Sequence, residues 1–183
     1  MQEIKLELVN ESKRLAFDNL FYLYHHELSI YIPELYPFVD EEGYYDRKAT
    51  DDFYNKPNSV IEPYIIRCDT KIAGVMVFSR PPYVKPGCDY CIQELFLLNN
   101  YRRKGIAEEA CKILLNEYPG RYCIQVITEN LKAMKFWNKL ITKNGTLISQ
   151  EKYSNILTVF EFNIKGSIWI KFAYLSTTAN KIL

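Results

Sequence analysis

The chain has 183 residues, and its 23 Lys and Arg side chains against 22 Asp and Glu leave a net charge of +1. A folded chain of this size buries about 70% of the surface that it exposes when unfolded, so one domain can be stable without a metal or a disulfide. A composition of 48% hydrophobic and 25% charged residues excludes a disordered chain, and the near-zero charge excludes nucleic acid as the expected partner.

The N-terminal part of the chain is predicted to form a strand, a helix and a hairpin. Residues 3–9 alternate between apolar and charged side chains, which is typical of a half-buried strand. The runs 60–66 and 72–78 are rich in β-branched residues and are joined by Asp69, Thr70 and Lys71, which predicts a hairpin. After the first strand and before the hairpin, Asn10 is placed to cap a helix. Its apolar stripe consists of Ala16, Leu20, Leu23, Tyr24 and Leu28.

Residues 31–59 have no regular period and predict a long loop or short helices. Carboxylates gather there among tyrosines, so a cationic amine could be attracted to this segment; a solvated acidic loop is the alternative. These carboxylates are Asp40, Glu41, Glu42, Asp46, Asp51 and Asp52.

The C-terminal part of the chain alternates strands and helices. A strand over 90–98 leads through a basic turn into a helix that Pro119 and Gly120 end, and a strand over 122–128 follows. Asn130 then caps a second helix. Strands are predicted at 146–150, 157–164 and around 168–174, before a frayed tail at 175–183. This order predicts a single α/β domain (α+β, mixed sheet) over 1–183, mostly antiparallel with one parallel pair.

The basic turn is the most informative stretch for function. Arg102, Arg103 and Lys104 come directly before Gly105, where the helix is expected to begin. The first amides of a helix have no internal partner and the helix dipole is positive there, so a pyrophosphate is a natural ligand. A solvated surface turn is the alternative, and the turn alone does not separate the two.

The surrounding sequence resembles a known family. The pattern Arg-x-x-Gly-x-Ala over 102–107, followed by Asn-x-x-Ala-x-x-Phe-Trp over 130–137, is similar to the GNAT family of acyl-CoA-dependent N-acetyltransferases, and more narrowly to a bacterial branch of unassigned substrate. The resemblance implies a GNAT-like fold whose parallel pair splays apart, a cofactor core at about 90–141 and acetyl-CoA as the acyl donor. The cofactor-binding residues that it implies are Phe96, Leu97, Leu98, Arg102, Arg103, Lys104, Gly105, Ile106, Ala107, Asn130, Ala133, Phe136 and Trp137.

Two positions bear on catalysis. Many family members carry Tyr where this chain has Trp137, and an indole cannot protonate a departing thiolate. Glu94 is the one carboxylate on the central strand and is therefore the candidate base. Strand alternation puts its side chain on the face of the strand opposite to that of Gln93, so a β-bulge decides whether Glu94 faces the cleft. Tyr153 and Glu161 are weaker candidates.

The sequence therefore predicts an N-acetyltransferase that moves an acetyl group from acetyl-CoA to a primary amine of a small molecule or peptide. The alternative is a non-catalytic acyl-CoA-binding or regulatory module. A cationic amine and a homodimer are options for its partners, and neither nucleic acid nor a membrane is expected. The acceptor side is expected over about 31–59.

The cysteines and the N-terminus indicate the compartment. Five cysteines, an odd number, and no signal-like run in residues 1–10 favour a reducing cytoplasm. Cys88 and Cys91 have the CxxC spacing, but no second pair accompanies them, so no metal is expected. Cys111 and Cys123 fall on apolar faces and are predicted to lie in the core.

Overall fold

The computed structural model describes residues 2–34, 38–43, 50–57 and 60–166, and the predicted strand at 168–174 and the tail lie outside this description. Its helices and strands alternate much as the sequence indicates. They are β1 (Ile4–Leu8), α1 (Glu11–Leu28), α2 (Asp51–Tyr54), β2 (Ile61–Cys68), β3 (Lys71–Ser79), β4 (Cys91–Leu97), the 3₁₀ turn η1 (Asn99–Tyr101), α3 (Ile106–Glu117), β5 (Gly120–Ile127), α4 (Leu131–Asn144), β6 (Thr146–Lys152) and β7 (Leu157–Ile164).

The strands form two sheets. One sheet has the order β1-β2-β3-β4 and the other β5-β7-β6, with antiparallel pairing within each. In the described part of the chain, one parallel bridge, between Tyr90 and Tyr122, connects the two sheets, directly before β4 and near the start of β5. The predicted parallel pair is therefore present only at its first residues, and beyond them β4 and β5 belong to separate sheets.

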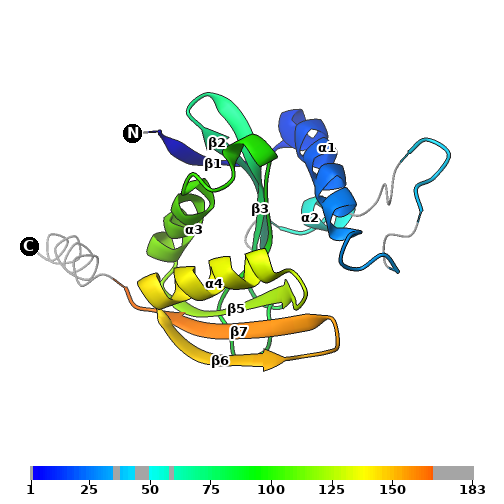
Figure 1. Cartoon of the computed structure of the whole chain (residues 1–183). Coiled ribbons are helices and arrows are strands. Elements are labelled where there is room, and N and C mark those ends of the chain that lie inside the picture. The colour runs from blue at the N-terminus through cyan, green and yellow to red at the C-terminus, as the bar shows by residue number, and fades with distance from the viewer. Residues whose placement is uncertain (1, 35–37, 44–49, 58–59, 167–183) are drawn as a thin grey trace, which may run out of the picture.

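Helices cover both faces of the larger sheet. In Figure 1, α1 and α2 lie on one side of β3 and α3 on the other. The alternation of side chains along the strands explains this arrangement, because Ile65, Val75 and Val77 pack with α1 whereas Ile66, Met76 and Phe78 pack in the core that holds α3 and α4. Each face therefore has its own apolar core.

The apolar stripe predicted for α1 is wrong at Leu23. Leu23 is 52% exposed, whereas Phe17, Leu20, Phe21 and His25 are buried. Phe17 and Phe21 stack with ring centroids 5.6 Å apart, and both contact Phe53 of the short helix α2. Because of these contacts, the buried face of α1 is the one that carries Phe17 and Phe21. Within the described part of the chain, no helix has the length and apolar character that crossing a membrane requires.

β4 carries an irregularity that bears on the site. Val77 pairs with Glu94, but the next residue of β3, Phe78, pairs with Ile92, so Gln93 is an extra residue on β4. Such a bulge changes which face the following side chains take. The sequence left it to a bulge on this strand to decide whether Glu94 faces the cleft, and the structure has such a bulge.

Gly74 on β3 provides a test of the pairing between β3 and β4. A Cβ atom there would collide with the Phe96 carbonyl oxygen and lie 2.9 Å from the Leu97 Cα atom. We expect Gly74→Ala to lower the free energy of unfolding by about 1–3 kcal/mol, because backbone atoms cannot yield as a flexible side chain would. Chemical denaturation measures this change.

Gly166→Ala is the matched control for that substitution. A Cβ atom at Gly166 meets nothing nearer than the Pro119 side chain at 3.5 Å, which is ordinary contact. Equal stability of the two variants would show that β3 and β4 do not approach as closely as described.

Candidate ligand-binding groove

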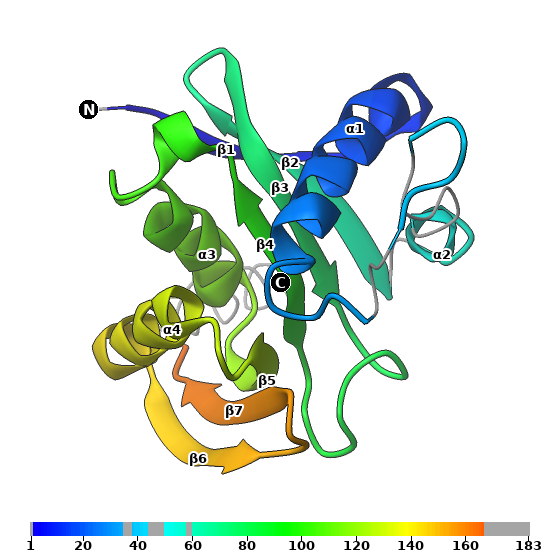
Figure 2. The ribbon, with the colours of Figure 1, turned by 45° about the vertical axis from the view of Figure 1, so that its right-hand side comes forward.

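A groove runs along the open end of the pair β4 and β5. It consists of a cavity of about 650 Å³ between α1, β4, β5 and α4 and a smaller one of about 230 Å³ at the start of α3. Leu97, Arg103, Ala107 and Phe136 line both cavities, so the two form one continuous groove. Figure 2 shows the elements concerned, with β4 between α1 and α3 and with α4 beside the smaller sheet. A volume of this size is typical of small-molecule sites.

The end of the groove at α3 has the features of an anion site. Gly105 precedes α3 with a φ of 81°, and Arg103 has a φ of 60°, so the turn is left-handed at two positions. Apart from Gly105 itself, its chain neighbours and the helix backbone, no atom of the described residues lies within 4 Å of where a Cβ of Gly105 would stand. The first amides of α3 have no carbonyl partner one turn earlier, so they can bind an anion that enters this open space.

Two lysines that the sequence analysis missed also line the groove. Lys139 lines the smaller cavity and Lys132 the larger one, on the same face of α4 as Phe136. The spacing 132, 136 and 139 follows the helical repeat, so the pattern around the Asn-x-x-Ala motif could have revealed them. Together with Arg103 they give this part of the groove a positive charge.

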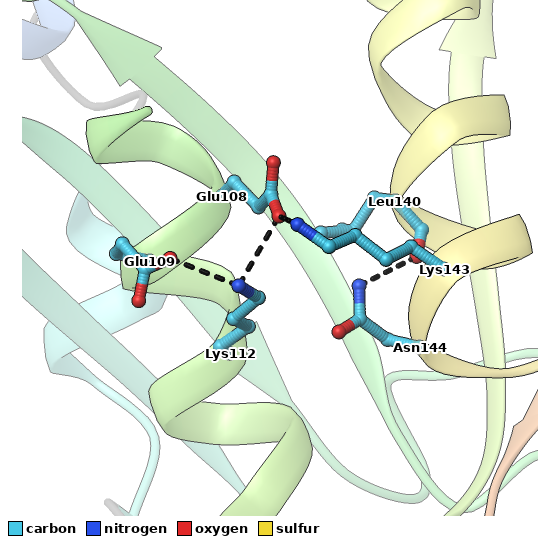
Figure 3. Close-up of polar contacts among 6 residues, drawn as sticks. All are labelled: Glu108, Glu109, Lys112, Leu140, Lys143 and Asn144. Carbon is cyan, nitrogen blue, oxygen red and sulfur yellow. Dashed lines mark hydrogen bonds and ion pairs between the residues drawn. The ribbon is translucent and has the colours of Figure 1, made fainter. Parts of the chain in front are cut away.

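Among the residues that the structure describes, one carboxylate lines the smaller cavity, and neighbouring lysines neutralise it. Figure 3 shows Glu108 of α3 between Lys143 of α4 and Lys112, whose ammonium lies 3.1 Å from the Glu108 Oε1 atom. These lysines hold the pKa of Glu108 below its ordinary value. The ion pair between Glu108 and Lys143 links α3 to α4 at the groove. Because the charge of Glu108 is neutralised, this carboxylate does not repel an anion bound there.

The wall on α4 is built as the motif indicates. The Asn130 side chain accepts a hydrogen bond of 3.1 Å from the Ala133 amide, which confirms the predicted cap. Asn130, Ala133, Phe136 and Trp137 all line the larger cavity. The Phe136 and Trp137 rings meet edge to face at 5.0 Å, and Trp137 is only 6% exposed, so it also belongs to the core.

Arg102 does not add a free charge to the groove. Its guanidinium donates two hydrogen bonds to the Glu27 carboxylate on α1, and its Nε atom donates one of 2.6 Å to the Leu97 carbonyl. The Arg102 guanidinium also lies over the Phe96 ring. Arg102 therefore connects α1 to the end of β4, and its contribution is to position the groove.

Most of the other expected residues line the groove, but two do not. Phe96, Leu97, Ile106 and Ala107 belong to its lining, whereas Leu98 and Lys104 are absent from it among the described residues. The Leu98 amide donates to the Ala73 carbonyl at 2.9 Å, so it is committed to the sheet.

Glu94 lies half-buried in the larger cavity, after the bulge at Gln93. Burial raises the pKa of Glu94 to about 7, and a hydrogen bond from Tyr24 of α1 opposes that rise. A carboxyl group with a pKa near neutrality can exchange a proton at physiological pH. Tyr24 and Tyr31 line the same cavity from the α1 side, and no sequence pattern singled them out.

The remaining candidates lie elsewhere. Tyr153 is 74% exposed, and Glu161 is paired with Lys85 and Arg121 away from the groove. In the acidic segment, Asp51 pairs with Arg14 at 2.6 Å. Asp40, Glu41 and Glu42 are exposed and outside the lining, and Asp46 lies outside the described residues. The described residues hold no group of three or more His, Cys, Asp or Glu arranged as a metal site.

The hydrogen bond between Tyr24 and Glu94 gives a direct test of this electrostatic environment. We expect the Glu94 carboxyl to titrate near pH 7 and to titrate higher in Tyr24→Phe, because the lost hydroxyl favoured the charged form. Carboxyl chemical shifts in NMR across a pH series measure both values. Tyr31→Phe, which alters a second groove tyrosine, should leave the Glu94 pKa unchanged; a fall in Tyr24→Phe would contradict the contact.

Comparison with known proteins identifies this arrangement. The model of the acetyltransferase (GNAT) family matches residues 22–140. No curated protein sequence matches significantly.

Solved structures with the same fold are found in several bacteria. An acetyltransferase from Thermus thermophilus is 14% identical, with a TM-score of 0.63 over 90% of this chain and 100% of that one. A protein described as histone acetyltransferase HPA2 and related acetyltransferase, from Corynebacterium glutamicum, is 9% identical, with a TM-score of 0.65 over 92% and 99%. A GNAT family acetyltransferase from Elizabethkingia anophelis with acetyl-CoA bound is 10% identical, with a TM-score of 0.53 over 88% and 98%.

Proposed function

Because the chain belongs to the GNAT acetyltransferase family, we propose that it transfers an acetyl group from acetyl-CoA to a primary amine. The observation that carries this proposal is the groove itself, which joins a positive helix N-terminus at Gly105 to a carboxyl group of raised pKa at Glu94. One end suits a pyrophosphate and the other suits proton removal from an amine. A transferase for acyl-CoA needs both in one continuous space.

Several features of the groove support acetyl-CoA as the donor. The residues at the start of α3 and Arg103 and Lys139 would hold the phosphates, and the α4 wall of Ala133 and Phe136 offers an apolar surface to the extended arm. The Elizabethkingia protein of the same fold has acetyl-CoA bound. When bound, acetyl-CoA would supply a thioester carbonyl that an amine can attack.

The proposed role of Glu94 is to take a proton from the amine. An ammonium group is not a nucleophile, so the acceptor must lose a proton before it attacks. A base with a pKa of about 7 is largely ionised just above neutrality and still accepts a proton readily. Arg102 neutralises Glu27, so among the described residues of the larger cavity Glu94 is the carboxylate without an ion-pair partner.

Trp137 favours a second candidate function, a module that binds acyl-CoA without turnover. Its indole stands where many family members carry the Tyr that protonates the leaving thiolate, and it lines the larger cavity. A thiol is acidic enough to leave as a thiolate at a cost, so the loss of an acid slows the reaction without preventing it. Release of free CoA thiol in a screen of amine acceptors separates the two functions.

Gly105 tests the proposed donor site. We expect acetyl-CoA to bind with micromolar affinity and Gly105→Val to abolish binding, because a branched side chain would fill the open space in front of the α3 amides. Isothermal titration calorimetry measures both affinities.

Gly87→Val is the matched control for the strain of that substitution. Gly87 has a φ of 87° and open space around its Cβ position, and it lies outside the groove lining. Equal loss of binding in both variants would remove the Gly105 turn as the anion site. No binding by the unmodified protein at millimolar ligand would remove acetyl-CoA as the donor.

Glu94 tests the proposed chemistry. We expect Glu94→Gln to lower turnover by about 10²–10⁴ at neutral pH while the affinity for acetyl-CoA changes little. In the unmodified enzyme kcat/KM should rise with pH through about 7, as the carboxyl group of raised pKa becomes ionised, and this rise should be lost in the variant. Glu151→Gln, at an exposed position on β6, is the control. Unchanged turnover in Glu94→Gln would exclude Glu94 as the base.

A further inference from the structure

Three of the five cysteines lie together outside the groove. Cys88, Cys91 and Cys123 form one buried cluster, against which Val84 packs. The CxxC spacing links only the first two, and Cys123 comes from another strand. None of the three lines the cavities described above.

The strand geometry makes Cys91 and Cys123 neighbours. Tyr90 and Tyr122 form the parallel bridge, and the Cys123 amide donates to the Tyr90 carbonyl at 3.0 Å. The next residue on each strand, Cys91 and Cys123, therefore occupies the adjacent position on the same face. The strands are still joined at this pair, because the Cys91 and Cys123 side chains are hydrogen-bonded to each other. Adjacent strands at a bridge lie about 4.8 Å apart, and disulfides join Cα atoms about 4.4–6.8 Å apart.

Hydrogen bonds converge on the Cys123 sulfur. The Lys85 backbone amide donates to the Cys123 Sγ atom at 3.4 Å, and the Cys91 and Cys88 thiols also donate to it. These bonds, that from Cys91 first, hold the pKa of Cys123 below its ordinary value, although burial and, to a smaller extent, the Glu161 carboxylate oppose the shift. Lys85 and Arg121 pair with Glu161 and so limit its effect.

The other two cysteines are in a different environment. Cys68 and Cys111 are buried in the apolar core around α3, and burial raises the pKa of each thiol. The bond to Cys123 together with burial also raises the pKa of Cys91, and burial raises that of Cys88. A thiol is a poor nucleophile compared with a thiolate, so Cys123 is the nucleophilic cysteine of the cluster. The chain therefore contains its own controls for the reactivity of the cluster.

We propose that Cys91 and Cys123 form a redox-active dithiol site that hydrogen peroxide converts to a disulfide across the bridge between β4 and β5. This inference is independent of the acetyl transfer proposed above, because it uses none of the groove residues.

The oxidation balances in two steps. The Cys123 thiolate attacks one peroxide oxygen, the O–O bond breaks, hydroxide leaves and a sulfenic acid forms. The Cys91 sulfur then attacks the Cys123 sulfur, the S–S bond forms and the S–OH bond breaks. Hydroxide leaves with the Cys91 proton as water. Two thiols and one peroxide thus give one disulfide and two waters, with sulfur oxidised and peroxide reduced.

The position of the cluster allows a small oxidant to reach it. The loop from Pro81 to Gly87 covers it, and every residue of that loop except Val84 is exposed. The Lys85 side chain, which pairs with Glu161, is 47% exposed, and its backbone amide contacts the Cys123 sulfur. The exposed loop is therefore in direct contact with Cys123, and peroxide is close to water in size.

Peptide mapping of the whole protein after peroxide treatment tests the proposal. We expect a disulfide that links the peptides of Cys91 and Cys123, with a mass lower by two hydrogen atoms, while Cys68 and Cys111 stay reduced. The double variant Cys68→Ala and Cys111→Ala should form the same disulfide at the same rate. The double variant Cys88→Ala and Cys91→Ala, which removes both thiols that contact the Cys123 sulfur, should instead stop at the sulfenic acid on Cys123, which dimedone traps.

Other results would overturn the proposal. A disulfide mapped to Cys88 in place of Cys91 would contradict the pairing. Oxidation of Cys68 or Cys111 as fast as that of Cys123 would show that the cluster has no special reactivity. The mapping on the unmodified protein decides the matter even if the variant that lacks Cys88 and Cys91 does not fold.

Discussion

The separation of β4 from β5 after the bridge between Tyr90 and Tyr122 is the constraint on which the groove depends. At the bridge, aromatic packing holds the two strands together: the Tyr90 and Tyr122 rings lie 5.2 Å apart, and Phe78 stacks on Tyr90. β5 pairs with β7 along its whole length, and beyond the bridge β4 and β5 continue in separate sheets. Ligands in α/β proteins bind at such openings, beyond the carboxyl ends of diverging strands.

Ion pairs between distant segments keep that opening in shape. Arg102 connects α1 to the end of β4, and Glu108 connects α3 to α4, so both sides of the groove are fixed by compensated charges. The groove therefore keeps the α3 amides, Arg103 and Lys139 at one end and the Glu94 carboxyl at the other for contact with a ligand. Exposed ion pairs add little stability, so their main effect here is on geometry.

The sequence predicted the fold well because its signals are local. The capping Asn130, the turn at Gly105 and the periodic stripe of α3 all depend on neighbouring residues, and the structure has them where the pattern indicates. Three features depended on distant contacts and were missed or misjudged. Arg102 meets a carboxylate 75 residues earlier in the chain, the α1 stripe turns toward Phe53, and Cys123 joins Cys91 through strand pairing. Glu94 was predicted only in part: the sequence singled out the residue, but the face that its side chain takes depends on the bulge at Gln93, which the sequence does not show.

We propose that the divergence of β4 and β5 forms a groove for acetyl-CoA whose anion site lies at the start of α3. Titration of the ¹⁵N-labelled protein with acetyl-CoA, followed by amide chemical shifts, locates the ligand on the molecule. We expect large shifts at Gly105, Ile106 and Ala107, with weaker ones along α4 at Asn130 and Ala133 and none at Gly87. Shifts confined to other parts of the protein, with the Gly105 to Ala107 amides unchanged at saturating ligand, would contradict it.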